Sequence, residues 1–152
     1  MSKELKSSIH RWDTLAEGVG RKVNEVQKVL IFVRDKQNKL DGERTKLGEM
    51  KREYASKLKE VQVGAHDMEQ VTYLRRFLGQ LDVAAKAIGT ELEVLAIQQG
   101  KIQEQFRALH SEQVKFNTLA SRSRKQLNDV LQRADQKDQD MMNVMRFEVL
   151  KR

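Results

Sequence analysis

Apolar side chains recur at alternating intervals of three and four residues along almost the whole chain. One such series runs from Ile9 to Val61, and a second runs from Val71 to Val144. The polar interruptions of the first series are Gln37, Arg44 and Lys51. This spacing lines the apolar residues up along one helix face and is typical of a left-handed coiled coil, whereas a half-buried strand needs strict alternation. The sequence therefore predicts an all-α protein.

The composition agrees with long helices and a thin core. The chain has 152 residues and no proline, with 34% charged and 5% aromatic residues. An average protein contains about 5% proline, which breaks helices. The length is typical of one domain, so we predict that residues 1–152 form a single coiled-coil domain.

The segment between the two apolar series predicts a turn, because the two series are out of register with each other. Gly64 can adopt positive φ and close a helix, and Asp67 can cap the start of the next helix. We expect one helix over about 8–61, a turn over about 62–67 and a second helix over about 68–150. A short break of this kind gives a long antiparallel two-helix coiled-coil hairpin.

The two predicted helices differ in length, so the C-terminal helix should overhang. At 1.5 Å per residue they measure about 80 Å and about 125 Å. If the chain folds back near residue 64, Ile9 lies opposite Ala120, and residues beyond about 121 have no partner in the chain. The overhang carries "MMNVMRF" (141–147). Methionine tolerates imperfectly matched surfaces, which favours partner binding over the alternative of a frayed or self-associated tail.

Residues for catalysis are not grouped in this sequence. The absence of cysteine excludes a thiol nucleophile, a disulfide framework and a cysteine-ligated metal. The three histidines lie far apart in the chain, and no glycine-rich phosphate loop or nucleophile motif is present. We therefore expect a protein that is not an enzyme, with no catalytic, cofactor-binding or metal-binding residues.

The net charge of +7 leaves two interpretations open. Long helices need charged faces for solubility, and this interpretation is favoured. The alternative is a basic coiled coil that binds nucleic acid or acts as a scaffold, with Arg122, Arg124 and Lys125 as the basic cluster. The N-terminal residues are polar, and the longest apolar run, residues 29–33, is far too short to span a membrane, so we expect a cytoplasmic protein.

Two features depart from a plain apolar stripe. Phe77 and Ala84 precede stripe positions by one residue, and with Leu81 they widen the apolar face sideways. Such widening indicates either thicker packing or a binding edge, and the periodicity alone favours packing. Trp12 lies on the stripe itself, where it either packs or anchors a partner.

Three stretches resemble a known family. They are "KVNEVQKVLIFVRDKQNKL" with "LGEMKREYASKL" (22–40 and 47–58), "FLGQLDVAAK" (77–86) and "RADQKDQDMM" (133–142). In order and spacing they are similar to the flagellar type III export protein of the FliJ type, the stalk-like component of the export ATPase complex.

The resemblance implies a set of partners. The family's free helix ends enter the central pore of a hexameric export ATPase. This predicts ATPase-ring contacts at Met141, Met142, Met145, Phe147 and Trp12. The second-helix flank of the family touches the export gate, a membrane protein, which maps onto Phe77, Leu81 and Ala84. Export chaperones are further implied partners, nucleic acid is not one, and the implied location is the inner face of the cell membrane, held there through partners.

Overall fold

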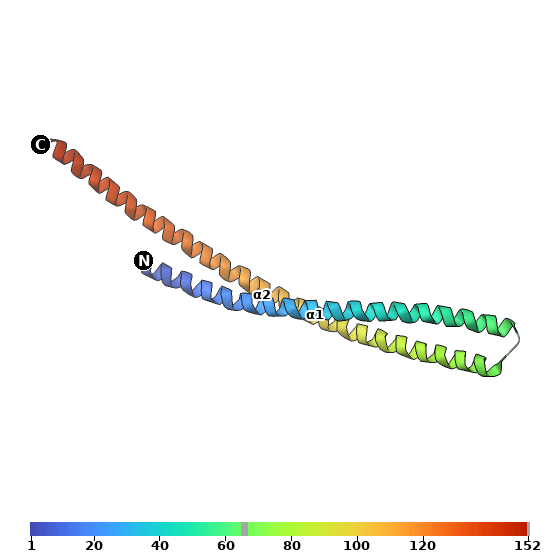
Figure 1. The fold of residues 1–152 in the computed structure, drawn as a ribbon. Coiled ribbons are helices and arrows are strands. Elements are labelled where there is room, and N and C mark those ends of the chain that lie inside the picture. Colours follow the sequence, from blue (N-terminus) through green and yellow to red (C-terminus); the bar gives the residue numbers. More distant parts are fainter. Residues whose placement is uncertain (65–66, 152) are drawn as a thin grey trace. The chain divides into compact units, whose positions relative to one another are not determined.

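Two long helices make up the protein. The computed structural model describes residues 1–64 and 67–151. Helix α1 spans Ser2–Val63 and helix α2 spans Met68–Lys151 (Figure 1). No strand occurs in these described ranges. The prediction of an all-α protein with a two-helix hairpin is confirmed, and α1 begins earlier than the predicted residue 8.

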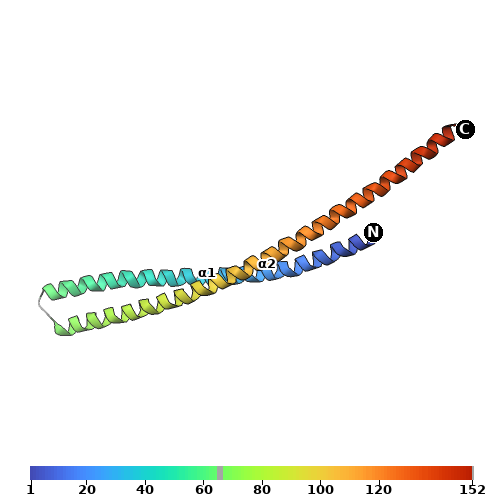
Figure 2. The same ribbon diagram turned by 180° about the vertical axis from the view of Figure 1, so that it is seen from behind.

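The chain divides into two compact units, each built from both helices. One unit comprises Met1–Glu25 with Phe106–Arg152, and the other comprises Val26–Gln105. In the second unit the two helices run side by side in opposite directions, as both views show (Figures 1 and 2). The organisation of residues 1–152 as a single domain stays a prediction.

The end of α1 differs from the expectation. The N–H of Gly64 donates to the carbonyl of Glu60 at 3.1 Å, so the α-helical bonding pattern continues to Gly64. No described glycine has positive φ, and the predicted left-handed Gly64 is therefore wrong. Residues 65–66 of the predicted turn lie outside the described residues.

The start of α2 follows the prediction. The N–H of Glu69 donates to Oδ1 of Asp67 at 3.1 Å, and the N–H of Val71 donates to the Asp67 carbonyl at the same distance. A side-chain oxygen at this position satisfies an N–H that has no partner inside the helix. The predicted Asp67 cap is confirmed.

The unit of residues 26–105 buries the predicted apolar stripes against each other. Its buried side chains are Val33, Val71, Leu74, Leu81 and Leu95. Two polar stripe residues of α1 are also paired: Gln37 Nε2 donates to Gln99 Oε1 at 3.1 Å, and Lys51 Nζ lies 2.5 Å from Asp82 Oδ1. Two of the three polar interruptions of the first heptad series therefore take part in contacts between the helices.

The other unit has a core of small residues. Its buried side chains are Ala16, Val19, Val23 and Ala120. Gly20 lets Gln113 approach α1, since a Cβ built on Gly20 would lie 3.0 Å from Gln113 Nε2. Small side chains allow two helix backbones to lie close together.

The unpaired part of α2 is shorter than predicted. Ser123, Leu127 and Val130 are half-buried, whereas every described residue from 131 onward is exposed. The expected limit near residue 121 is wrong because α1 starts at Ser2 and its first turns cover more of α2. The overhang of about 20 residues is about 30 Å long.

Candidate partner-binding surfaces

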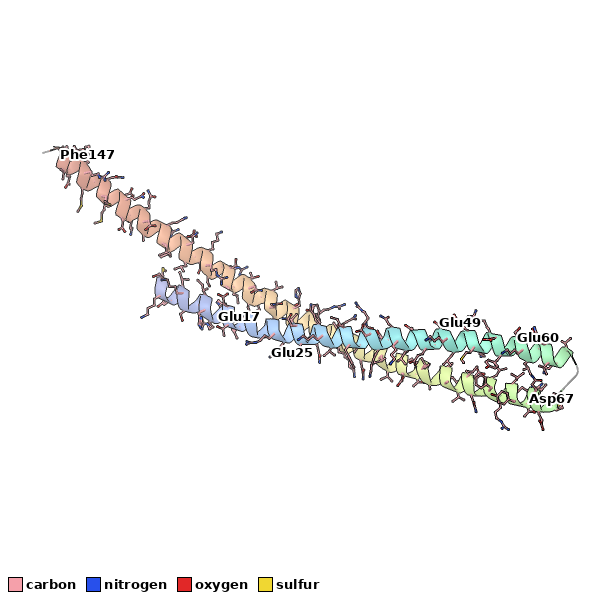
Figure 3. The ribbon with its side chains drawn as sticks, in the orientation of Figure 1. Glu17, Glu25, Glu49, Glu60, Asp67 and Phe147 are labelled. Carbon is pink, nitrogen blue, oxygen red and sulfur yellow. The ribbon has the colours of Figure 1, made fainter. Side chains whose placement is uncertain are left out.

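The overhang of α2 carries a cluster of exposed apolar side chains that we call the terminal patch. Its members are Met141, Met142, Val144, Met145, Phe147, Val149 and Leu150, which are exposed by 58–86%. Figure 3 shows Phe147 at the end of α2, where α1 has no counterpart. The prediction of an exposed apolar surface on the overhang is confirmed.

The terminal patch surrounds the helix rather than following one side of it. With 3.6 residues per turn, Met141, Met145 and Val149 lie along one side. Phe147 and Leu150 project from the opposite side, where Lys151 Nζ lies 5.3 Å from the Phe147 ring centroid. A helix that is apolar all round is normally enclosed on all sides.

Trp12 is already engaged within its own unit. Its ring stacks on Phe116 across the helices, with centroids 6.0 Å apart and planes 17° apart. The Arg11 guanidinium lies 5.2 Å from the Trp12 ring centroid. Phe116 precedes Met141 by about 38 Å along α2, so the structure does not bring Trp12 together with the predicted methionines.

Phe77 belongs to an aromatic cluster on the flank of the other unit. The centroid of its ring lies 4.6 Å from that of Tyr54 of α1, with an angle of 56° between the ring planes. The centroid of the Tyr73 ring is 6.4 Å away, with an interplanar angle of 8°. Lys57 Nζ lies 4.9 Å from the Tyr54 ring centroid. Phe77 is half-buried, so part of its ring packs between the helices and part remains on the surface.

The other two predicted flank residues differ in accessibility. Leu81 is only 6% exposed because it occupies a heptad stripe position and packs against α1. Ala84 is half-buried beside it. Sequence reasoning missed Tyr73, which is 64% exposed and lies four residues before Phe77 on the same side of α2. We call Tyr73, Phe77 and Ala84 the flank surface.

The basic cluster is smaller than the sequence indicates. Arg124, which is itself exposed, forms an ion pair with Asp13 of α1, and Arg122 and Lys125 are exposed as well. A guanidinium that is paired with a carboxylate is less available to a phosphate. Of the three basic side chains in the nucleic-acid alternative, two are therefore outside this ion pair.

Two further features are absent from the described part of the chain. Residues 1–64 and 67–151 contain no group of three or more acidic, histidine or cysteine side chains arranged to hold a metal ion. Within the same ranges, neither helix has a stretch apolar and long enough to cross a membrane.

Comparison with known proteins connects the hairpin to one family. Neither the curated proteins nor the solved structures gave a match to this chain. The family model described as flagellar FliJ protein matches residues 9–151, which include most of α1, all of α2, the flank surface and the terminal patch. The resemblance found in the sequence is thereby confirmed, and the chain belongs to the flagellar FliJ protein family of flagellar export components.

Proposed function

We propose that this chain is a non-enzymatic coupling protein of the flagellar type III export apparatus that inserts its terminal patch into the pore of the hexameric export ATPase. The observation that carries the proposal is the exposed apolar surface on all sides of α2 over residues 141–150. A groove on a partner covers one side of a helix, whereas a pore encloses every side. A ring is therefore the kind of partner that removes this whole surface from water.

The hairpin also fits the task of influencing a ring. A two-helix protein lacks six-fold symmetry, so it contacts the six ATPase subunits unequally. Unequal contacts favour different nucleotide states in different subunits, because a ligand shifts an equilibrium toward the state it binds better. In this role the chain changes the activity of the ATPase without catalysing a reaction.

The flank surface is the proposed contact for the export gate. Tyr73 and part of Phe77 offer aromatic surface, the residue class that dominates many binding hot spots. Leu81 lies beneath this surface, where it is buried against α1. Binding to the gate holds the chain at the inner face of the cell membrane. In the cytoplasm the chain also binds export chaperones.

The test is activation of the cognate export ATPase by the chain and by a variant of the terminal patch. We expect the triple change Met142→Gln, Met145→Gln and Phe147→Gln to abolish most of the activation. The free variant should keep its melting temperature, because exposed substitutions usually change the free energy of unfolding by about 0.5 kcal/mol or less each. Glutamine is a good helix former, so α2 itself should be preserved.

The matched control changes three exposed apolar residues elsewhere. Val83, Val94 and Ile97 are 50–69% exposed on α2, and their replacement by glutamine should leave ATPase activation intact. Equal loss of activation in both triple variants would show a non-specific dependence on apolar surface. Full activation by the terminal-patch variant would refute the pore contact.

A further inference from the structure

The heptad stripe of α2 continues beyond the part that α1 covers. Leu127 and Val130 are half-buried stripe residues. The same register continues through Ala134, Lys137, Met141, Val144 and Glu148, all of which are exposed. Lys137, Met141 and Val144 line a shallow groove on this face together with Asp140 and Met145. The face that binds α1 further back is therefore available to another helix here.

A second copy of the same segment matches this face when it runs in the opposite direction. If the two-fold axis passes between Met142 and Asn143, then Met141 of each copy lies opposite Val144 of the second copy. In the next layer, Lys137 of each copy lies opposite Glu148 of the second copy. Every layer then joins two apolar residues or two opposite charges, except the outermost, which joins an alanine to the long side chain of Lys151.

Parallel pairing of the same stripe is unfavourable. It would place Lys137 against Lys137 of the second copy and Glu148 against Glu148 of the second copy. Like charges that lie directly opposite each other destabilise a pair of elements, and charge patterns of this kind set the orientation of coiled coils. The charges therefore select the antiparallel arrangement.

The charges beside the stripe are also distributed unequally along the segment. Asp135, Asp138 and Asp140 outnumber Arg133 before the centre of the segment, whereas Arg146 is the flanking charge that follows it. Antiparallel pairing brings the acidic end of each copy beside the basic end of the second copy. Electrostatic complementarity of this kind favours one partner and one register.

We propose that free molecules of this protein pair through residues 131–151 of α2 as an antiparallel two-fold dimer. The segment is only three heptads long, and short helices gain little from pairing, so the dimer is weak. It also covers one side of the terminal patch and leaves Met142, Val149 and Leu150, which lie away from the stripe, in water. A partner that encloses the whole helix displaces the second copy, so the dimer keeps the patch partly covered until that partner is present.

The first test measures the dimer dissociation constant of the full chain by sedimentation equilibrium from about 1 µM to about 200 µM, a range suited to weak complexes. Lys137→Glu alone and Glu148→Lys alone each create two repulsive layers. Each single variant should raise the dissociation constant about tenfold or more. The double variant Lys137→Glu with Glu148→Lys restores opposite charges and should return to within about threefold of the original value.

The second test reads the orientation directly. The chain has no cysteine, so single cysteines report only the contact under study. An equimolar mixture of Met141→Cys and Val144→Cys chains should oxidise mainly to mixed dimers, because a disulfide needs Cβ atoms about 3.5–4.5 Å apart. Parallel pairing would instead link each variant to itself. Val83→Cys, on an exposed face of α2 outside the paired segment, should form no disulfide-linked dimer.

Four results would overturn the proposal. They are a chain that stays monomeric at about 200 µM, single charge variants that dimerise as the original does, a double variant that fails to recover, and cysteine variants that each link mainly to themselves. Displacement of the dimer by the export ATPase rests on the proposed function and is measured separately. If the dimer forms but the ATPase neither binds nor displaces it, the pairing stands and the proposed function fails.

Discussion

Phe77 combines packing within the hairpin with an accessible surface. Its ring contacts Tyr54 on α1 and Tyr73 on α2, and it is half-buried. Offset aromatic pairs contribute about 0.5–1.5 kcal/mol beyond the burial of their surface. Truncation of a fully buried phenylalanine costs about 3–5 kcal/mol, so a half-buried one should cost less.

We predict that Phe77→Ala lowers the free energy of unfolding by about 1–3 kcal/mol, measured by urea denaturation followed by circular dichroism. Tyr54→Ala is the matched control, because it removes the same ring contact from α1 and leaves the flank surface of α2 intact. At a temperature where both variants are folded, Phe77→Ala should reduce binding to the cytoplasmic domain of the export gate more than Tyr54→Ala does. Equal binding by the two variants would restrict Phe77 to a packing role.

The helices contain interior glycines whose surroundings differ. A Cβ on Gly42 or Gly48 would meet no atom within 4 Å, whereas a Cβ on Gly20 would lie 3.0 Å from Gln113 Nε2. Glycine inside a helix costs about 1 kcal/mol relative to alanine, because its unfolded backbone has more freedom to lose. These positions therefore distinguish the intrinsic cost of glycine from its use in close packing.

We predict that Gly42→Ala and Gly48→Ala each raise the free energy of unfolding by up to about 1 kcal/mol. Gly20→Ala should raise the free energy of unfolding by clearly less, because the Gln113 amide has to shift to make room for the new methyl group. Urea denaturation of the three variants measures the difference. A gain at Gly20 equal to that at Gly42 would show that Gln113 moves away at no cost.

The heptad stripes were predictable from sequence because the period of apolar residues fixes which helix face is buried. The start of α1 was missed because helix ends carry weak signals. Leu5 was the available signal, since it lies four residues before Ile9 on the same stripe and is half-buried. That extension moved the end of the covered stripe from about residue 121 to Val130.

The binding surfaces were predictable only in part. The terminal patch followed from the unequal lengths of the helices. The packing of Trp12 on Phe116 and the pairing of Arg124 with Asp13 could not be predicted, because each depends on the exact offset between the two helices. A heptad pattern fixes the face of a helix but leaves its offset along the partner helix open.

The whole protein has little buried surface for its length. Across residues 1–64 and 67–151, nine hydrophobic side chains are buried, and the last of them along the chain is Ala120. Local stability depends on such contacts, and regions without them open more easily. The protein should therefore show a gradient of stability along α2, lowest in the overhang.

Hydrogen exchange measures that gradient and its response to a partner. In dilute solution, where self-association is negligible, we predict that amides of residues 131–151 exchange much faster than those of residues 71–130. The reason is that an isolated helix of about 20 residues is only marginally stable in water, whereas the other amides lie in helix turns packed against α1. Addition of the hexameric export ATPase should slow exchange in residues 141–151 about tenfold or more, because enclosure removes both water and fraying. Slow exchange of the overhang in the dilute free protein would mean that other contacts cover it. Protection that appears only around the flank surface would move the ATPase contact to the other unit.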